Sequence, residues 1–507
     1  MAETPKDTFV MAKNFDDIIS LDPAEVFELS GGEVIANVYD RIMTHEAENT
    51  EKLVPGVAES YTVSDDGKTI TLKIRPGLKF HSGNPLTAED VAFSLQRVIL
   101  LDKTPAFILS QFGWTKDNVK DLVKATDPST VQLTITEDFS PTLVLNCLSA
   151  GVGSVVDKKL VLEHERDGDL GYEWLKTHSA GSGPFELKSW KPNETIVLEA
   201  FPGDRHGAPK VKRVVIRHVA EPAAQRLLLE KGDIDLARDL TTDQIQGIAG
   251  NKDIVIETHP KADLYYLALN QKDERLSNPK VRQAIRWLID YQGMADTFLK
   301  GRFKVHQSFW PSGFEGSLTD TPFHLDVAKG KQLLAEAGYP DGFEVELDAA
   351  NSSPQSDIAQ SIQQTLGQAG IKAKIVSGDQ KQVLTKYRSR QHQMLLLYWS
   401  PDYIDPHSNA DSFARNPDNS DNASAAPLAW RNAWDIPEIT KETDAAARER
   451  DPDKRLQMYI DLQKKLQEDS PFVILFQKVD QVARRANVTG FVSGASFDQV
   501  YYRLVSK

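Results

Sequence analysis

The segment from Trp399 to Pro406 carries the residues whose types and spacing best suit chemistry. It begins at the end of an uninterrupted apolar run, 394–399, which predicts a buried strand. Trp399 offers a flat apolar face and one N–H donor, while Asp402, next to Tyr403, offers an anionic acceptor for an ammonium group or several hydroxyls. The pattern predicts a binding site for an amine-bearing or hydroxylated molecule. A core tryptophan and a turn-forming aspartate are the alternative interpretation.

A second aromatic residue and cation, Trp430 and Arg431, offer another ring face and a positive charge for an anionic group of a ligand. They follow the region 407–427, which is rich in Asn, Asp, Ser and Pro and is predicted to form a long surface loop. The alternative is that both residues only pack this loop onto the protein.

Motifs for catalysis, metal binding or cofactor binding are absent from the sequence. None of the 11 histidines shows His-x-His or His-Glu-x-x-His spacing, and isolated ones such as His306 and His407 are more often surface or core residues. The Gly-Ser-Gly sequence at 181–183 lacks the third glycine of a dinucleotide loop, and no phosphate-binding loop or nucleophile elbow occurs. We therefore expect no cofactor, no metal and no enzymatic activity. A hydrolase that uses carboxylates such as Asp402 and Asp405 is the alternative from another class.

The strand that ends at Trp399 is the last of a regular series. Between 327 and 399 the hydrophobic pattern predicts helix, strand, helix, strand, helix and strand. Such alternation indicates βαβ units and a parallel sheet, and the run at 394–399, apolar on both faces, belongs in the middle of that sheet. Ligands of open α/β sheets bind beyond the carboxyl ends of the strands, where Trp399 and Asp402 stand.

The same signals predict elements elsewhere in the chain. Strands are expected at 69–74, 264–269 and 472–476. Helices are predicted to begin at a capping box, Thr87 to Asp90, and at the pairs Asn278-Pro279 and Asp451-Pro452, because Pro suits the first helical position.

Length and composition limit the classes of protein. The 507 residues exceed one ordinary core and correspond to roughly three structural units. No apolar run approaches the roughly 18 residues that a membrane span requires. A net charge of −14 argues against nucleic acid as a partner, because duplex affinity comes mainly from clustered Lys and Arg. The single cysteine, Cys147, cannot form an internal disulfide.

Five sequence blocks in a fixed order carry a family resemblance. They read LVPGVAES at 53–60, IRPGLKFHSG at 74–83, GSGPF at 181–185, NPKVRQAI at 278–285 and AEAGYPDGF at 335–343. In this order the chain resembles the peptide/opine/nickel class of ABC-importer solute-binding proteins, the family of the dipeptide- and oligopeptide-binding proteins, over nearly its whole length.

The resemblance implies a two-lobed α/β receptor of the type II periplasmic-binding-protein fold (cluster C), with an extra subdomain in lobe I. Two crossing strands near 262 and 478 would form the hinge, and closure about it would enclose the ligand. The implied divisions are lobe I at 1–41, the extra subdomain at 42–176, lobe I again at 177–262, lobe II at 263–478 and a return to lobe I at 479–507.

The function implied by the resemblance is that of an extracytoplasmic solute-binding protein. It would capture a peptide or a similar small polar solute and deliver it to the permease subunits of an ABC importer in the inner membrane. An opine or sugar-like solute is the alternative within the class. The resemblance also implies a periplasmic monomer whose signal peptide has been removed, since the N-terminal sequence MAETPK shows no basic-then-apolar leader.

Two positions acquire roles from the resemblance. Trp399 and Asp402 fall where peptide binders of this family place a pocket tryptophan and the aspartate that anchors the α-ammonium group. One position departs from the pattern, because dipeptide binders place an arginine after the strand near 343–347, where this chain has Ala349, Ala350 and Asn351. A free dipeptide held in the usual way is therefore disfavoured. A longer peptide, paired through its backbone, or an opine or sugar-like solute would not need that arginine.

Overall fold

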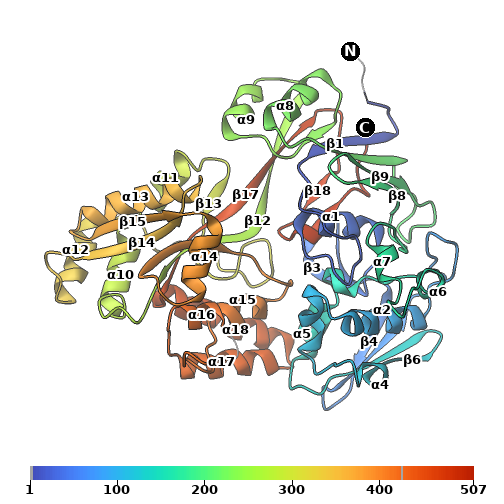
Figure 1. The fold of residues 1–507 in the computed structure, drawn as a ribbon, viewed down its shortest axis with the longest axis horizontal. Coiled ribbons are helices and arrows are strands. Elements are labelled where there is room, and N and C mark those ends of the chain that lie inside the picture. The colour runs from blue at the N-terminus through green and yellow to red at the C-terminus, as the bar shows by residue number, and fades with distance from the viewer. Residues whose placement is uncertain (1–3, 424–425) are drawn as a thin grey trace. The chain divides into compact units, whose positions relative to one another are not determined.

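The computed structural model describes residues 4–423 and 426–507, which form two compact units. The first unit comprises Met1–His259 and Asp480–Lys507, and the second comprises Pro260–Val479. Two long strands, β12 (Ile254–Leu269) and β17 (Phe472–Arg485), run from one unit into the other (Figure 1). Both connections between the units are therefore strands rather than loops. None of the helices in the described part of the chain has the length and apolar character of a membrane span.

The sheet of the second unit has the strand order β15-β14-β16-β12-β17, with β13 also paired to β17. Its remaining strands are β13 (Phe303–Val305), β14 (Glu344–Ala350), β15 (Lys372–Gly378) and β16 (Met394–Trp399). β14 runs parallel to β15 and β16, whereas β16 pairs antiparallel with β12. The predicted alternation of helices and strands between 327 and 399 is confirmed, and so is the central place of β16.

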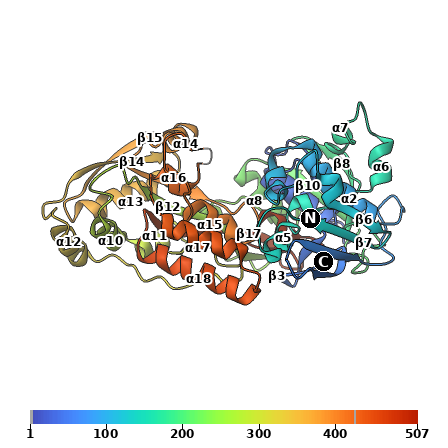
Figure 2. The same ribbon diagram turned by 90° about the horizontal axis from the view of Figure 1, so that it is seen from below.

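Helices cover both faces of this sheet, which explains why β16 is apolar along its length. Met394 and Leu396 belong to a core shared with one helical layer: α10 (Pro279–Trp287), α11 (Tyr291–Asp296), α12 (Val327–Glu336) and α13 (Gln355–Gly367). On the other face Tyr266 packs edge-on against Phe413 and Phe472. Phe413 belongs to α15 (Pro406–Phe413), and the remaining helices of the unit are α14 (Gln380–Arg388), α16 (Leu428–Arg431), α17 (Pro437–Arg448) and α18 (Pro452–Glu468) (Figure 2).

The prediction of a long surface loop at 407–427 is wrong for its first part. Residues Pro406–Phe413 form α15, and most of them are buried. The helix begins where the Asp405 carboxylate accepts a hydrogen bond from the backbone N–H of His407 at 2.8 Å, with Pro406 at the first helical position. The polar composition is misleading because side chains such as Asn409 form hydrogen bonds inside the protein.

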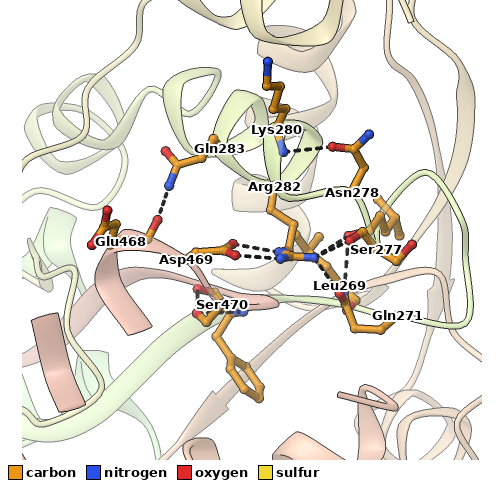
Figure 3. Close-up of polar contacts among 12 residues, drawn as sticks. Leu269, Gln271, Ser277, Asn278, Lys280, Arg282, Gln283, Glu468, Asp469 and Ser470 are labelled. Carbon is orange, nitrogen blue, oxygen red and sulfur yellow. Dashed lines mark hydrogen bonds and ion pairs between the residues drawn. The ribbon is translucent and has the colours of Figure 1, made fainter. Parts of the chain in front are cut away.

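Arg282 of α10 ties three segments of the second unit together (Figure 3). Its Nε and Nη2 donate to the two carboxylate oxygens of Asp469 at 2.9 and 2.7 Å. Its Nη1 donates to the Gln271 side chain and to the Ser277 carbonyl, both at 2.7 Å. The Arg282 guanidinium therefore joins the end of β12 and the start of α10 to the connection between α18 and β17. The predicted cap of α10 by Asn278 is confirmed.

The first unit contains a sheet with the order β8-β9-β10-β1-β11, continued by the end of β17. A separate four-stranded sheet, β4-β5-β7-β6, packs against α2 (Ala88–Leu101), whose predicted capping box is confirmed. The strands are β1 (Thr8–Lys13), β2 (Met43–Glu46), β3 (Asn49–Pro55), β4 (Ala58–Val63), β5 (Thr69–Ile74), β6 (Val123–Asp127), β7 (Thr130–Thr134), β8 (Phe185–Lys191), β9 (Thr195–Ala200), β10 (Arg213–His218), β11 (Leu236–Ala237), β18 (Val492–Ser493) and β19 (Val500–Tyr501). The helices are α1 (Leu29–Val38), α3 (Phe107–Ser110), α4 (Val119–Leu122), α5 (Pro141–Cys147), α6 (Lys158–Glu163), α7 (Tyr172–Leu175), α8 (Pro222–Lys231) and α9 (Thr242–Ile248).

A buried carboxylate fixes α1 in the first unit. Glu33 accepts hydrogen bonds from Lys13 at 2.5 Å, Arg238 at 2.7 Å and the Tyr502 hydroxyl at 2.6 Å. Burial alone would raise the pKa of Glu33, but Arg238 and Lys13 outweigh burial and lower it to about 2. The carboxylate therefore links α1 to β1, to the segment after β11 and to the C-terminal segment as a permanent negative charge.

We predict that Glu33 makes folding sensitive to acid. Its folded-state pKa lies below that of an unfolded glutamate, so its stabilising effect is present above about pH 4.5 and is lost as the pH falls toward 2. Between those limits the free energy of unfolding should fall by on the order of 3 kcal/mol more in wild type than in Glu33→Gln. Urea titrations at a series of pH values measure this difference. The exposed Glu59→Gln should follow wild type, and equal pH slopes for wild type and Glu33→Gln would contradict the prediction.

Candidate ligand-binding site

The segment 400–405 connects β16 to α15 and is fixed to that helix by hydrogen bonds. The backbone N–H of Asp402 donates to Ser408 Oγ at 2.8 Å. At the end of the segment Asp405 caps α15 through the backbone N–H of His407. The chain beyond the carboxyl end of β16 is thus held by the helix that follows it.

A buried ion pair anchors this segment to α18. Arg455 donates from Nη1 and Nη2 to the two carboxylate oxygens of Asp405 at 2.9 and 2.8 Å. The two side chains are only 3% and 0% exposed. Burial opposes the charge on Arg455, but the adjoining Asp405 carboxylate outweighs it and raises the pKa of the guanidinium. The two charges therefore persist at neutral pH and hold the segment in place.

Trp399 presents a ring but no free donor. Its indole N–H donates to Asn409 Oδ1 at 3.0 Å, and the Asn409 amide in turn donates to the Phe309 carbonyl at 2.5 Å. The edge of the partly exposed indole meets Phe413 at a centroid distance of 6.4 Å and an interplanar angle of 90°. The expectation of an available N–H donor is therefore corrected, because the fold uses that donor itself and leaves an aromatic surface.

Asp402 is a partly buried carboxylate without a counter-ion. No hydrogen bond or ion pair to its side chain occurs among the residues that the structure describes. Burial, reinforced by the nearby carboxylate of Asp411, raises the pKa of Asp402 to about 6. Asp411 itself faces Arg415, two residues beyond the end of α15, at 3.4 Å. A cationic group placed at Asp402 would offset the cost of burying its charge.

The other predicted site residues have partners of their own. Tyr403 is buried, and its phenol influences the pKa of Arg455. Trp430 donates its indole N–H to the Ser420 carbonyl at 2.8 Å, and Arg390 lies over its ring at 4.4 Å. Arg431 donates from Nε to the Ala426 carbonyl at 3.1 Å. In the described ranges neither Trp430 nor Arg431 bonds to Asp402, and the contacts observed are with residues 420 and 426.

The end of β14 carries an acidic side chain just before positions 349–351, which hold no arginine. Ala349 and Ala350 are buried, and the preceding Asp348 pairs with Lys386 of α14 at 2.8 Å. Lys386 also faces Glu346 at 3.4 Å. Lys386 is therefore already engaged with two carboxylates of β14.

The sequence analysis missed the part of the site that α15 contributes. In α15, Ser408 binds the backbone of Asp402, Asn409 binds the Trp399 indole, and Asp411 raises the pKa of Asp402. The polar character of these residues favours a loop in the sequence. The pair Asp405-Pro406 is the same cap-and-proline signal that correctly predicts α10 and α18, and it could have revealed this helix.

The arrangement suits binding of a cationic or hydroxylated group better than metal chemistry. An aromatic surface and one uncompensated carboxylate lie at the carboxyl end of a central strand, as in other open α/β sheets that bind ligands. Across residues 4–423 and 426–507 no three His, Cys, Asp or Glu side chains gather in a way that could hold a metal ion.

Comparisons with known proteins identify the family of the chain. The model for "Bacterial extracellular solute-binding proteins, family 5 Middle" matches residues 52–421. The chain is 29% identical over 505 residues to the probable D,D-dipeptide-binding periplasmic protein DdpA of Escherichia coli (strain K12), covering 99% of this chain and 94% of that protein. It is 26% identical over 491 residues to the glutathione-binding protein GsiB of Salmonella typhi, covering 94% and 91%. The structure of HbpA2 from Haemophilus parasuis aligns with a TM-score of 0.83 at 22% identity, covering 98% of this chain and 99% of that one.

The structural likeness defines the class as the two-lobed, type II periplasmic-binding-protein fold. Because the family model covers most of the chain, the protein belongs to the bacterial extracellular solute-binding proteins of family 5. It is a solute-binding protein of an ABC importer, as the sequence predicted.

We expect Arg455→Met to destabilise the protein, because it leaves the Asp405 carboxylate buried without a cation. The free energy of unfolding should fall by about 3–5 kcal/mol, measured by urea denaturation. Lys441→Met, in an exposed pair with Glu438 at 2.8 Å, should cost less than about 1 kcal/mol. The double variant Asp405→Ala/Arg455→Met should recover part of the loss. If Arg455→Met costs no more than Lys441→Met, the buried pair does not hold the segment.

Proposed function

We propose that this protein captures a peptide, or a similar small solute with a cationic amine, and that Asp402 anchors the amine beside the ring of Trp399. The observation that carries the proposal is the partly buried Asp402 carboxylate, which no described residue neutralises. An ammonium group supplies both the missing charge and hydrogen-bond donors. The names of two relatives, a D,D-dipeptide-binding and a glutathione-binding protein, support a peptide-like ligand.

Capture and release would use the two strand connections as a hinge. β12 and β17 each continue through the boundary between the units, so rotation about them would close the lobes on the solute. The closed form would then engage the permease subunits of the importer. In this proposal the protein acts in the periplasm as a monomer and returns the solute chemically unchanged.

The ligand's other end would be held without an arginine from β14. Lys386 is already paired with Asp348, and the strand ends in two small buried residues, Ala349 and Ala350. This favours a peptide longer than a dipeptide, held partly through its backbone. An opine or sugar-like solute is the alternative, since a carboxylate also accepts hydrogen bonds from hydroxyls.

We predict that Asp402→Asn and Trp399→Ala each weaken solute binding by more than about 1 kcal/mol, as anchors of buried polar and aromatic contacts do. Native mass spectrometry of the purified protein would first identify the retained solute, and calorimetry would then measure its affinity. Glu344→Gln, at the exposed start of β14, serves as the control and should bind as wild type. Near-unchanged affinity in both site variants would refute the site. Conversion of the solute over many turnovers would instead support the hydrolase alternative.

Solute affinity should fall in mild acid if the anchored group is an amine. The pKa of Asp402 in the ligand-free protein is raised to about 6, and only the ionised carboxylate pairs with an ammonium group. Between about pH 7 and pH 5 the ionised fraction falls about tenfold, so the apparent Kd should rise about tenfold. Calorimetry at both pH values measures this, with Asp402→Asn as the pH-insensitive control. A solute that shows no pH dependence in wild type would point to hydroxyls rather than an amine.

A further inference from the structure

A cavity of about 50 Å³ lies in the first unit and is lined only by residues of that unit. It is found where α1 ends and β2 begins, beside the C-terminal segment. Its volume is several times what a single water needs, so it has room for a small multi-atom group. The polar residues that dominate its lining are Arg41, His45, Glu46, Arg205, Tyr501 and Arg503.

Arg41 leaves one edge of its guanidinium without partners. The side chain is only 4% exposed, and Nη1 donates to the Ser149 carbonyl at 2.8 Å and to Asp498 at 3.1 and 3.2 Å. Its Nε and Nη2 are buried and find no hydrogen-bond partner in the described part of the chain. These two nitrogens form the edge that pairs side by side with the oxygens of a carboxylate or phosphate. Donors left unmet in this way cost stability, which a bound oxyanion would offset.

The charges around the cavity favour an anion. Arg205 faces Asp40 at 3.2 Å and Glu46 at 3.8 Å. Arg503 faces Glu46 at 3.8 Å and, outside the lining, the exposed Glu48 at 3.3 Å. Asp40 and Glu46 are the only anions on the lining as described, against the three arginines. Beyond Arg41, Asp498 occupies the opposite edge of that guanidinium.

The two histidines of the lining remain neutral at physiological pH. Burial lowers the pKa of His45 to about 4, and its Nδ1 also lacks a partner in the structure as described. Burial, together with Arg205, Arg503 and Arg75, lowers the pKa of His206 to about 3. The cationic surroundings that oppose a charge on His206 would favour a negative ligand.

We propose that this cavity binds a small oxyanion, inorganic phosphate or a carboxylate, on the Nε–Nη2 edge of Arg41, with Arg205 and Arg503 beside it. Two oxygens spaced as in a carboxylate or phosphate match the two coplanar donors, whereas a halide offers a single acceptor centre. The proposal stands apart from the function of Trp399 and Asp402, since those residues belong to the other unit and do not line this cavity.

The test is a titration of the full-length protein with inorganic phosphate, acetate and chloride at constant ionic strength. Thermal unfolding and calorimetry are followed in parallel. In calorimetry phosphate or acetate should bind saturably, and Tm should rise by at least about 2 °C at a concentration about 100-fold above Kd. The stronger of the two ligands identifies the source of the oxyanion. Calorimetric heats that do not saturate, or an equal Tm shift with chloride, would overturn the proposal.

Three variants test which residues bind the anion. Arg41→Lys keeps the charge but removes the paired donors, so the affinity for phosphate or acetate should fall at least tenfold. Arg503 is 15% exposed, and Arg503→Gln should also weaken anion binding. This variant tests the proposal if Arg41→Lys does not fold. The control is Arg213→Gln, an exposed arginine of the same unit paired with Glu199 at 2.8 Å, which should bind as wild type. Equal anion affinity in Arg503→Gln and Arg213→Gln would overturn the proposal. Solute affinity should be unchanged in all three, so a failure here leaves the role of Asp402 intact.

Discussion

The buried ion pair between Asp405 and Arg455 is the constraint on which the candidate site depends. Separating two such charges inside a protein costs several kcal/mol, because each would remain buried without its partner. The pair therefore ties the segment after β16 to α18 across 50 residues of the chain. Since Asp405 also caps α15, one carboxylate fixes both the end of the loop and the start of the helix that supports Asp402 and Trp399.

Asp402 and Asp405 show how environment separates two chemically identical side chains. Asp405 meets a guanidinium fork and a helix N-terminus, both of which favour its ionised form. Asp402 meets another carboxylate and no cation in the structure as described, so burial raises its pKa toward neutrality. The first arrangement is stable by itself and has a structural role. The second is stabilised only when something positive or strongly hydrogen-bonding arrives, which is the property expected of a binding group.

The sequence predicts the second unit well because its signals are local. Alternating hydrophobicity and cap-proline pairs locate β14, β15, β16, α10 and α18, and the apolar run of β16 correctly places it mid-sheet. The sequence does not show which side chains of different segments meet. Asp405 pairs with Arg455 across 50 residues, whereas the Trp399 N–H meets Asn409 and the Trp430 N–H meets the Ser420 carbonyl across only 10 residues each. All three contacts depend on how the segments fold onto one another. Those contacts decide which polar atoms remain available to a ligand.

Buried charges that the fold leaves incomplete are therefore the most informative feature of both units. Most buried carboxylates here, such as Asp22 with Arg97 and Glu33 with Arg238, have a cation of their own and complete the architecture. Among the described residues, Asp402 has no cation beside it, and the Nε and Nη2 atoms of Arg41 have no hydrogen-bond acceptor. Desolvation penalises each of them in the same way, but the sign differs, so the group that relieves the penalty must differ too. An unpaired carboxylate favours an ammonium or hydroxyl group, and an unpaired guanidinium edge favours an oxyanion, which makes the two sites chemically complementary rather than equivalent.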